Sequence, residues 1–294
     1  TSIQMDKSLF NVAVLHLPSY DLLLMVCHHI VVDAVSWRII LEDLGTSYGQ
    51  AISGNEIKLQ AKTNTYHDYV NAVFNYRNSH TLDQEVNYWR SVQQKMQSLP
   101  TSNGKKHDRK IVKVELTLDK VTTENLLYKV STKFNTEIND LLMTALGRGY
   151  YKLSGNHAVS VQFEGHGRED IGGNLLTDRT VGWFTSVYPV VLEGISGDMR
   201  KDIRTTKEIM HRVPNKGVGY NILRFIEGER SLEFDKDQVA LIGFNYLGEM
   251  DHGTDDENAL FSRPEEVVLS PDFAEENKFG PALNINSSVI EGVL

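Results

Sequence analysis

The sequence predicts an α/β fold, because strand patterns and helix patterns follow one another along the chain. An apolar run over residues 22–27 is typical of a buried strand, and apolar side chains then recur at helical spacing from Ile40 to Tyr48. Further along, the alternating residues 112–118 predict a strand and residues 137–153 a long amphipathic helix. With 294 residues, 40% of them hydrophobic, the chain can bury a large core in one domain or in two lobes.

The first third of the chain predicts a hairpin and helices. Residues 11–17 alternate between apolar and polar side chains, and the turn-like segment 18–21 joins them to the apolar run at 22–27. This arrangement predicts a β-hairpin. Two further helical patterns cover residues 66–77 and 82–92.

A polar stretch over residues 100–109 is the best candidate for a linker, since it contains Pro and Gly and nothing apolar interrupts it. We therefore expect an N-terminal lobe over residues 1–108 and a C-terminal lobe over residues 109–294. In the second lobe, Asp119 is placed to cap a helix and Thr136 to begin the long one.

Composition and charge narrow the possible partners and location. A formal net charge of −9 disfavours nonspecific binding of nucleic acid, although it is compatible with a protein partner that docks on a local patch. The sequence shows no apolar stretch of membrane-spanning length and no signal-peptide pattern, so we expect a cytoplasmic protein that does not enter a membrane. The single cysteine, Cys27, excludes an internal disulfide and a cysteine-rich metal site.

The segment from His28 to Asp33 is the first candidate site, because it places two imidazoles where a strand gives way to a helix. Adjacent residues of a strand point to opposite faces, so we expect one histidine to be catalytic and the other structural. Asp33 is placed either to cap the following helix or to orient a side chain in the loop. A buried, hydrogen-bonded pair of histidines is the alternative that these residues leave open.

A second titratable cluster, EGHGRE at residues 164–169, follows the strand-like residues 158–163. Further distinctive segments surround it in the sequence. They cover residues 139–147, 179–189, 214–220 and 244–248.

These segments and the HHxxxD motif at residues 28–33 resemble, in their order and in their amino-acid sequence, the epimerization domains of nonribosomal peptide synthetases, within the condensation-domain superfamily. HHxxxD is shared with condensation domains and chloramphenicol-acetyltransferase-like enzymes, whereas EGHGRE, RTVGWFTxxYP and FNYLG resemble the epimerization branch. The resemblance extends from about Leu9 to Leu294. One departure is Ala34, where the family usually has Gly, and a methyl group there is costly only if φ is positive.

The resemblance implies an α+β sandwich of two chloramphenicol-acetyltransferase-like lobes in a V, with the first lobe incomplete and the reaction centre in a tunnel between them. His29 would come from the first lobe and Glu164 from the second. The implied reaction is epimerization of the Cα of an L-aminoacyl or L-peptidyl thioester through an enolate, with acid and base on opposite faces.

The implied substrate is tethered by phosphopantetheine to a peptidyl carrier protein domain. That carrier and the neighbouring synthetase domains are the implied partners. No cofactor of the protein's own is required for this chemistry, and no nucleotide or metal motif is apparent in the sequence.

Within this scheme, burial would raise the pKa of Glu164 until it becomes a useful acid, whereas an exposed carboxylate paired with Arg168 is the alternative. Asn245 and Tyr246 are candidates for donating hydrogen bonds to the enolate oxygen, with strand packing and turn formation as their other possible roles. We expect His166 to support Glu164 rather than to react, and His28 to support folding.

The same residues leave three alternatives to an epimerase. A condensation domain would use His29 to assist the attack of an amine on a thioester, and the presence of Glu164 argues against it. A catalytically degenerate module would only dock a carrier protein. A metal pair formed by His29 and Asp33 lacks a third ligand nearby in the sequence. The sequence does not identify the amino acid that is epimerized or the final product.

The ends of the chain lead to a further expectation. The sequence enters the family pattern shortly before HHxxxD and stops at residues 284–294, where a family member would continue. We therefore expect an internal fragment with uncovered apolar faces in its first lobe, poorly soluble and inactive by itself.

Overall fold

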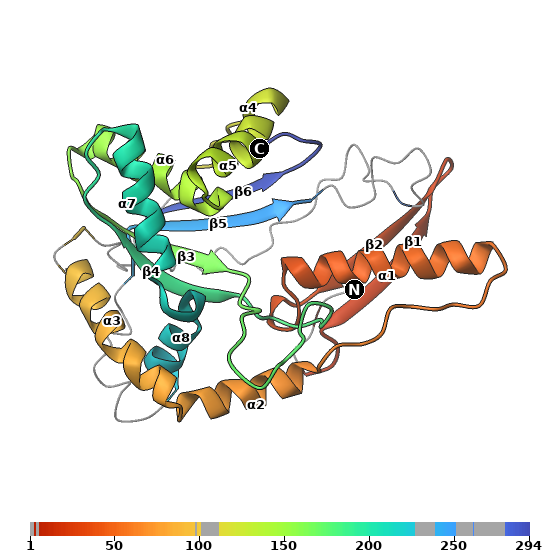
Figure 1. Ribbon diagram of the computed structural model, residues 1–294. Coiled ribbons are helices and arrows are strands. Elements are labelled where there is room, and N and C mark those ends of the chain that lie inside the picture. The colour runs from red at the N-terminus through yellow and green to blue at the C-terminus, as the bar shows by residue number, and fades with distance from the viewer. Residues whose placement is uncertain are drawn as a thin grey trace.

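The protein contains two β-sheets and the helices that pack on them, as a computed structural model describes for residues 3, 6–97, 99–100, 112–226, 239–250, 261 and 280–294. Figure 1 shows a hairpin and a long helix at one end of the molecule, a four-stranded sheet at the other, and α2 extending from one part toward the other. None of the described helices is long and apolar enough to cross a membrane.

The N-terminal part is a β-hairpin followed by a helix, and both predictions are confirmed. Strands β1 (Phe10–His16) and β2 (Asp21–Cys27) pair antiparallel. A short 3-10 helix, η1 (His29–Val31), then leads into α1 (Ala34–Ile52). The histidines therefore lie where the strand ends, as the sequence indicated.

The four-stranded sheet has the order β4-β3-β5-β6 and holds the second candidate cluster. Its strands are β3 (Val159–Gly165), β4 (Ser186–Leu192), β5 (Ile242–Glu249) and β6 (Leu283–Val289). Strand β3 pairs antiparallel with β4 and parallel with β5, which in turn pairs parallel with β6. Glu164 and Asn245 are direct partners in the β3–β5 pairing, so their side chains share one face of the sheet.

Helices lie on either side of this sheet in Figure 1, with α4 to α7 on one side and α2, α3 and α8 on the other. Their bounds are α2 (Tyr66–Arg77), α3 (His80–Gln97), α4 (Lys120–Glu124), η2 (Asn125–Val130), α5 (Ser131–Phe134), α6 (Ile138–Ser154), α7 (Met199–His211), η3 (Pro214–Gly217) and α8 (Val218–Phe225). The predicted helices over 66–77 and 82–92 are thus confirmed, as is the long helix in the second half.

One continuous core joins α2 and α3 to the four-stranded sheet. Trp89 of α3 is fully buried and packs against Tyr188 of β4 and Tyr220 of α8. Both helices precede the expected lobe boundary, yet they pack with elements that follow it. The linker prediction falls on residues that lie almost entirely within 101–111, outside the described part of the chain.

Two predictions about the second half are wrong in detail. Residues 112–118 form no strand, and the side chains of Val112, Val114 and Leu116 are exposed, with Leu116 at 86%. Alternation produces a strand only where a neighbouring strand pairs with it. Helix α6 is capped by Glu137 rather than begun by Thr136, and the Glu137 amide donates to the Asp140 carboxylate over 2.9 Å. Asp119 caps α4 as predicted, accepting from the Thr122 amide.

Gly167 is the glycine on which the approach of two chain segments depends. Its φ is +69°, and a Cβ atom there would lie 1.6 Å from the carbonyl oxygen of Phe184. The loop after β3 therefore passes the segment before β4 at a distance that only glycine permits.

We expect Gly167→Ala to destabilise the protein far more than Gly172→Ala. Gly172 also has a positive φ, +97°, but no heavy atom within 4 Å of its would-be Cβ, so it carries only a strain of about 1–2 kcal/mol. Urea denaturation of both variants measures the difference. Equal losses in free energy of unfolding would show that the contact with Phe184 is not a constraint.

Candidate active site

A buried ion pair between Asp33 and Arg168 joins the two candidate clusters. The Arg168 guanidinium donates from Nη1 to Asp33 Oδ2 over 3.0 Å and from Nη2 to Oδ1 over 3.1 Å. The side chains are only 6% and 4% exposed. Asp33 also caps α1 by accepting from the Ser36 amide over 2.7 Å. The carboxylate thus performs both roles that the sequence left open, capping a helix and orienting a side chain.

The ion pair also fixes the segment that precedes β4. The Phe184 amide donates to Asp33 Oδ2 over 3.1 Å, and Arg168 Nη2 donates to the Thr180 carbonyl over 2.9 Å. The Arg168 guanidinium lies 4.0 Å from the centre of the Phe184 ring, a cation–π contact. Burial lowers the pKa of Arg168, and the charge of Asp33 opposes this shift. Three segments that are distant in sequence are therefore held by one buried pair of charges.

Ser36 is a member of this network that the sequence analysis missed. Its hydroxyl donates to the Gly182 carbonyl over 2.8 Å and accepts from the Gly182 amide and from Arg168 Nη2, each over 3.0 Å. A signal was present in the sequence, because Ser36 stands three residues after Asp33, at the position whose amide an N-cap side chain accepts from.

Ala34 raises no conformational difficulty. It is the first residue of α1, and it is not among the described non-glycine residues that have a positive φ. The methyl group at the position where the resembled family usually has Gly is therefore accommodated in ordinary helical backbone.

The two histidines differ in what they contact. His28 Nδ1 accepts a hydrogen bond from the Ile30 amide over 3.1 Å, so this side chain caps the short helix η1. His29 is exposed, and its ring meets the Trp183 ring edge-on with 5.7 Å between centroids. His28 thus takes part in local backbone structure, while His29 is available to a reactant.

Glu164 lies near the end of β3, and Asn245 holds its carboxylate. Asn245 Nδ2 donates to Glu164 Oε2 over 3.0 Å. Burial raises the pKa of Glu164, as expected from the sequence, and the charge of nearby His29 opposes this shift. The alternative in which Glu164 pairs with Arg168 is not what the structure shows, because Arg168 pairs with Asp33.

Tyr246 and His166 lie differently from what their expected roles require. Strand alternation places Tyr246 on the face of β5 opposite to Asn245, where it packs against the core, so the two cannot converge on one enolate. Burial raises the pKa of Tyr246. The bonds of His166 go to the Arg168 amide over 3.1 Å and to Glu169 over 3.2 Å, rather than to Glu164.

Of the residues predicted from the sequence, the structure joins Glu164 to Asn245 and Asp33 to Arg168 by hydrogen bonds, and it places His29 against Trp183. Within the described ranges, no group of three or more His, Cys, Asp or Glu side chains is placed to hold a metal ion.

Comparison with known proteins places this site in context. The family model described as Condensation domain matches residues 3–286. Gramicidin S synthase 1 of Brevibacillus brevis is 38% identical over 305 residues, which cover 97% of this chain and 27% of that protein. Bacitracin synthase 3 of Bacillus licheniformis is 38% identical over 260 residues, covering 85% of this chain and 4% of that protein. The chain thus spans only a small part of these curated relatives.

Solved structures give a similar result. The epimerization domain from the third module of tyrocidine synthetase B superposes with a TM-score of 0.84 at 34% identity, covering 97% of this chain and 64% of that one. The first condensation domain of the CDA synthetase superposes with a TM-score of 0.58 at 19% identity, covering 81% of this chain and 50% of that one. The second likeness shows the fold alone.

We expect Arg168→Met to lower the free energy of unfolding by about 3–5 kcal/mol, because it leaves a buried carboxylate without its cation. Arg168→Lys should recover only part of this loss, since an ammonium group cannot form the planar bidentate pair. Urea denaturation measures both effects.

Asp33→Asn combined with Arg168→Met completes a double-mutant cycle that isolates the coupling between the two side chains. Arg212→Met is the matched control, because Arg212 pairs with Glu208 but is 73% exposed, and such pairs contribute about 0–1 kcal/mol. A coupling energy between Asp33 and Arg168 no larger than this would contradict the importance of the buried pair.

Proposed function

Because this chain belongs to the condensation-domain family and has its chloramphenicol-acetyltransferase-like fold, we propose that it is an epimerase of carrier-bound thioesters. Its substrate would be an L-aminoacyl or L-peptidyl group attached through phosphopantetheine to a carrier protein domain. The likeness to an epimerization domain over nearly the whole chain supports this choice within the family.

The observation that carries the proposal is that one segment, residues 183–186, lies against both an exposed imidazole, His29, and the strand that bears a half-buried carboxyl group, Glu164. Trp183 contacts the His29 ring, and Ser186, three residues later, is the strand partner of Gly165, which follows Glu164, so the segment 183–186 links the two groups. Burial raises the pKa of Glu164, and its hydrogen-bond partner, Asn245, is neutral. A carboxyl group in this environment keeps its proton to higher pH than an exposed one, which suits it to proton donation.

The proposed reaction needs one group on each face of the α-carbon. One of the pair, His29 or Glu164, removes the α-proton, and the electron pair of the broken C–H bond moves into the thioester to give an enolate. The other gives its proton to the opposite face, which forms the new C–H bond and restores the carbonyl group. In the reverse direction the two exchange roles. Asn245 would orient the Glu164 carboxyl group.

The proposed setting is a multidomain synthetase in the cytoplasm, with the carrier protein and neighbouring synthetase domains as partners. This chemistry calls for no cofactor of the protein's own, because the thioester already acidifies the α-carbon. A condensation domain is the second candidate, since the family as a whole includes that activity. It would use His29 to assist an amine, with no requirement for Glu164.

We expect His29→Ala and Glu164→Gln each to stop conversion in at least one direction, because neither group can act from the face of the other. The assay incubates the multidomain synthetase that carries this domain, with its carrier protein loaded with an L-aminoacyl group, and determines the stereochemistry of the released acid. Solvent-deuterium incorporation at the α-carbon separates the two roles. His28→Ala should instead lower thermal stability.

Near-normal conversion after either substitution would contradict the proposal that His29 and Glu164 act on opposite faces of the α-carbon. Amide formation in place of a D/L mixture would support condensation.

The raised pKa of Glu164 also predicts a pH-dependent effect on stability. Between the ordinary pKa of a glutamic acid and the raised folded value, the folded protein holds a proton that the unfolded chain has lost, so the stability contributed by this group falls as pH rises. Glu164→Gln has no such proton. We expect the melting temperature of Glu164→Gln, relative to the parent, to increase as pH rises from about 4 to about 8.

Glu56→Gln, at an exposed loop position, is the reference for this experiment. A melting-temperature difference for Glu164→Gln that does not vary with pH, or that decreases, would contradict the shift.

A further inference from the structure

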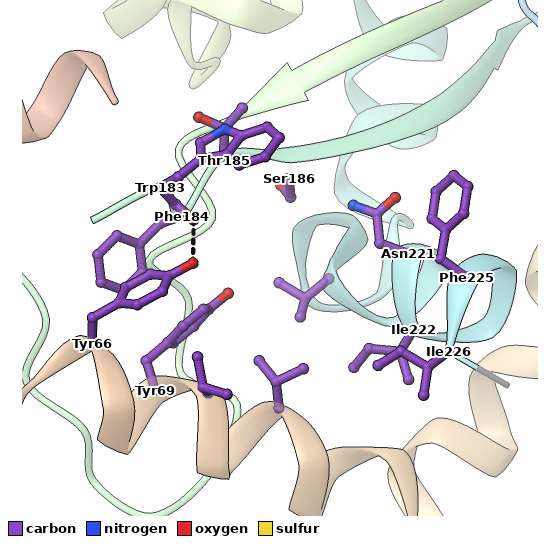
Figure 2. Close-up of a pocket in the computed structure, with 13 residues that line it drawn as sticks. Tyr66, Tyr69, Trp183, Phe184, Thr185, Ser186, Asn221, Ile222, Phe225 and Ile226 are labelled. Atoms are coloured by element: carbon purple, nitrogen blue, oxygen red, sulfur yellow. Dashed lines mark hydrogen bonds between the residues drawn. The ribbon is translucent and has the colours of Figure 1, made fainter. Parts of the chain in front are cut away.

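A cleft of about 320 Å³ lies beside the candidate active site. Its walls are α2, the segment 183–186 and α8. Figure 2 shows Tyr66 and Tyr69 on one wall and Asn221, Ile222 and Phe225 on the facing wall, with Trp183 and Ser186 above them. This volume is within the range of pockets that bind small molecules.

The chemistry of the walls favours an apolar occupant. Among the described residues that line the cleft, none is charged at neutral pH, and most are aromatic or aliphatic. Polar atoms of the walls are largely engaged: the Tyr66 hydroxyl donates to the Trp183 carbonyl over 2.8 Å, and the Ser186 hydroxyl donates to the Lys216 carbonyl over 3.2 Å. Phe225 remains 57% exposed and Trp183 43% exposed, so apolar surface is open to a ligand.

The cleft adjoins the groups proposed to move the proton. Trp183 contributes to its wall and also contacts the ring of His29. Ser186, on the same wall, is the strand partner of Gly165, the residue that follows Glu164. A substituent on a carbon held between His29 and Glu164 is therefore next to the opening.

We propose that this cleft holds the side chain attached to the reacting α-carbon, and that the protein prefers thioesters in which this side chain is bulky and apolar. The inference rests on the proposed function and deepens it by naming the substrate class. When the α-proton leaves, the α-carbon becomes planar, and reprotonation on the other face moves the side chain little. One cleft can therefore hold the side chain of both epimers, whereas the proton needs two separate partners.

The experiment compares three substrates that differ only in their side chain. L-phenylalanyl, L-alanyl and L-aspartyl groups are loaded on the same carrier protein, and deuterium incorporation at the α-carbon is followed in heavy water. We expect the phenylalanyl group to exchange at least about 10-fold faster than the aspartyl group, because the uncharged cleft cannot compensate for desolvation of a carboxylate.

The most direct test is a variant that fills the cleft with a larger side chain. Val73 lines the cleft from α2, and the next residue, Phe74, is 53% exposed and does not line it. We expect Val73→Trp to slow phenylalanyl exchange by about 10-fold or more while alanyl exchange changes by less than about threefold, since a methyl group needs little of the cleft. Phe74→Trp, the matched control, should leave both rates unchanged.

Asn221→Asp is the second variant, in case Val73→Trp does not fold. It introduces a negative charge at the wall that faces Tyr66, so it should increase the rate for an L-lysyl group relative to the L-phenylalanyl group.

The outcomes separate the two proposals. Absence of α-proton exchange with every substrate would overturn the proposed function, and this inference with it. Exchange of all three side chains at equal rates, equal slowing of alanyl and phenylalanyl groups by Val73→Trp, or an unchanged lysyl-to-phenylalanyl ratio in Asn221→Asp would overturn the assignment of the cleft alone.

Discussion

The buried ion pair of Asp33 and Arg168 is the constraint on which the candidate site depends. His29 stands four residues before Asp33, and Glu164 stands four residues before Arg168. Each of the two side chains proposed to react is therefore tied by a short stretch of chain to one member of the pair. Because the two charges form a planar bidentate contact with little solvent around it, the distance between the segments that carry them can vary little. The pair thereby limits how far His29 and Glu164 can separate.

The environments of the three carboxyl groups explain their different tasks. Asp33 meets a cation and two backbone amides, so its charge is compensated and serves architecture. Glu164 accepts a hydrogen bond from the neutral amide of Asn245, and burial raises its pKa against the opposing charge of His29. Glu169 meets His166 over 3.2 Å near the surface. Because the Arg168 guanidinium pairs with Asp33 and not with Glu164, burial can raise the pKa of Glu164, and its carboxyl group keeps its proton to higher pH.

The sequence predicted the parts of this arrangement that are local. The hairpin, α2 and the cap at Asp119 follow from alternation, helical spacing and capping residues within a few positions of one another. The partner of Arg168 could not be predicted in the same way, because Asp33 lies 135 residues away in the sequence, and the only partner considered from the sequence was the neighbouring Glu164. In the structure, Phe184 and Gly167 pack closely where the segments of Arg168 and Asp33 meet. Alternation alone separates Tyr246 from Asn245, but which of the two lies beside Glu164 depends on the register of β5 on β3, which no local pattern contains.

A second buried carboxylate organises the wall of the cleft that faces away from the ion pair. Glu85 is 3% exposed and accepts hydrogen bonds from the Trp89 indole over 2.9 Å, from the Asn215 amide over 2.9 Å and from the Tyr76 hydroxyl. Asn215 and Lys216 both have a positive φ, a conformation that costs about 1–3 kcal/mol for each such residue.

The bond from Asn215 to Glu85 holds this turn in its strained form, and the turn has two consequences for the cleft. The Lys216 carbonyl accepts from the Ser186 hydroxyl, and α8 begins at Val218, immediately after the turn. Ser186 and α8 both line the cleft, so the turn at Asn215 and Lys216 connects two parts of its wall. The two buried acids therefore have different roles. Asp33 holds the segments that carry His29 and Glu164, and Glu85 holds the turn beside the cleft that we propose for the substrate side chain.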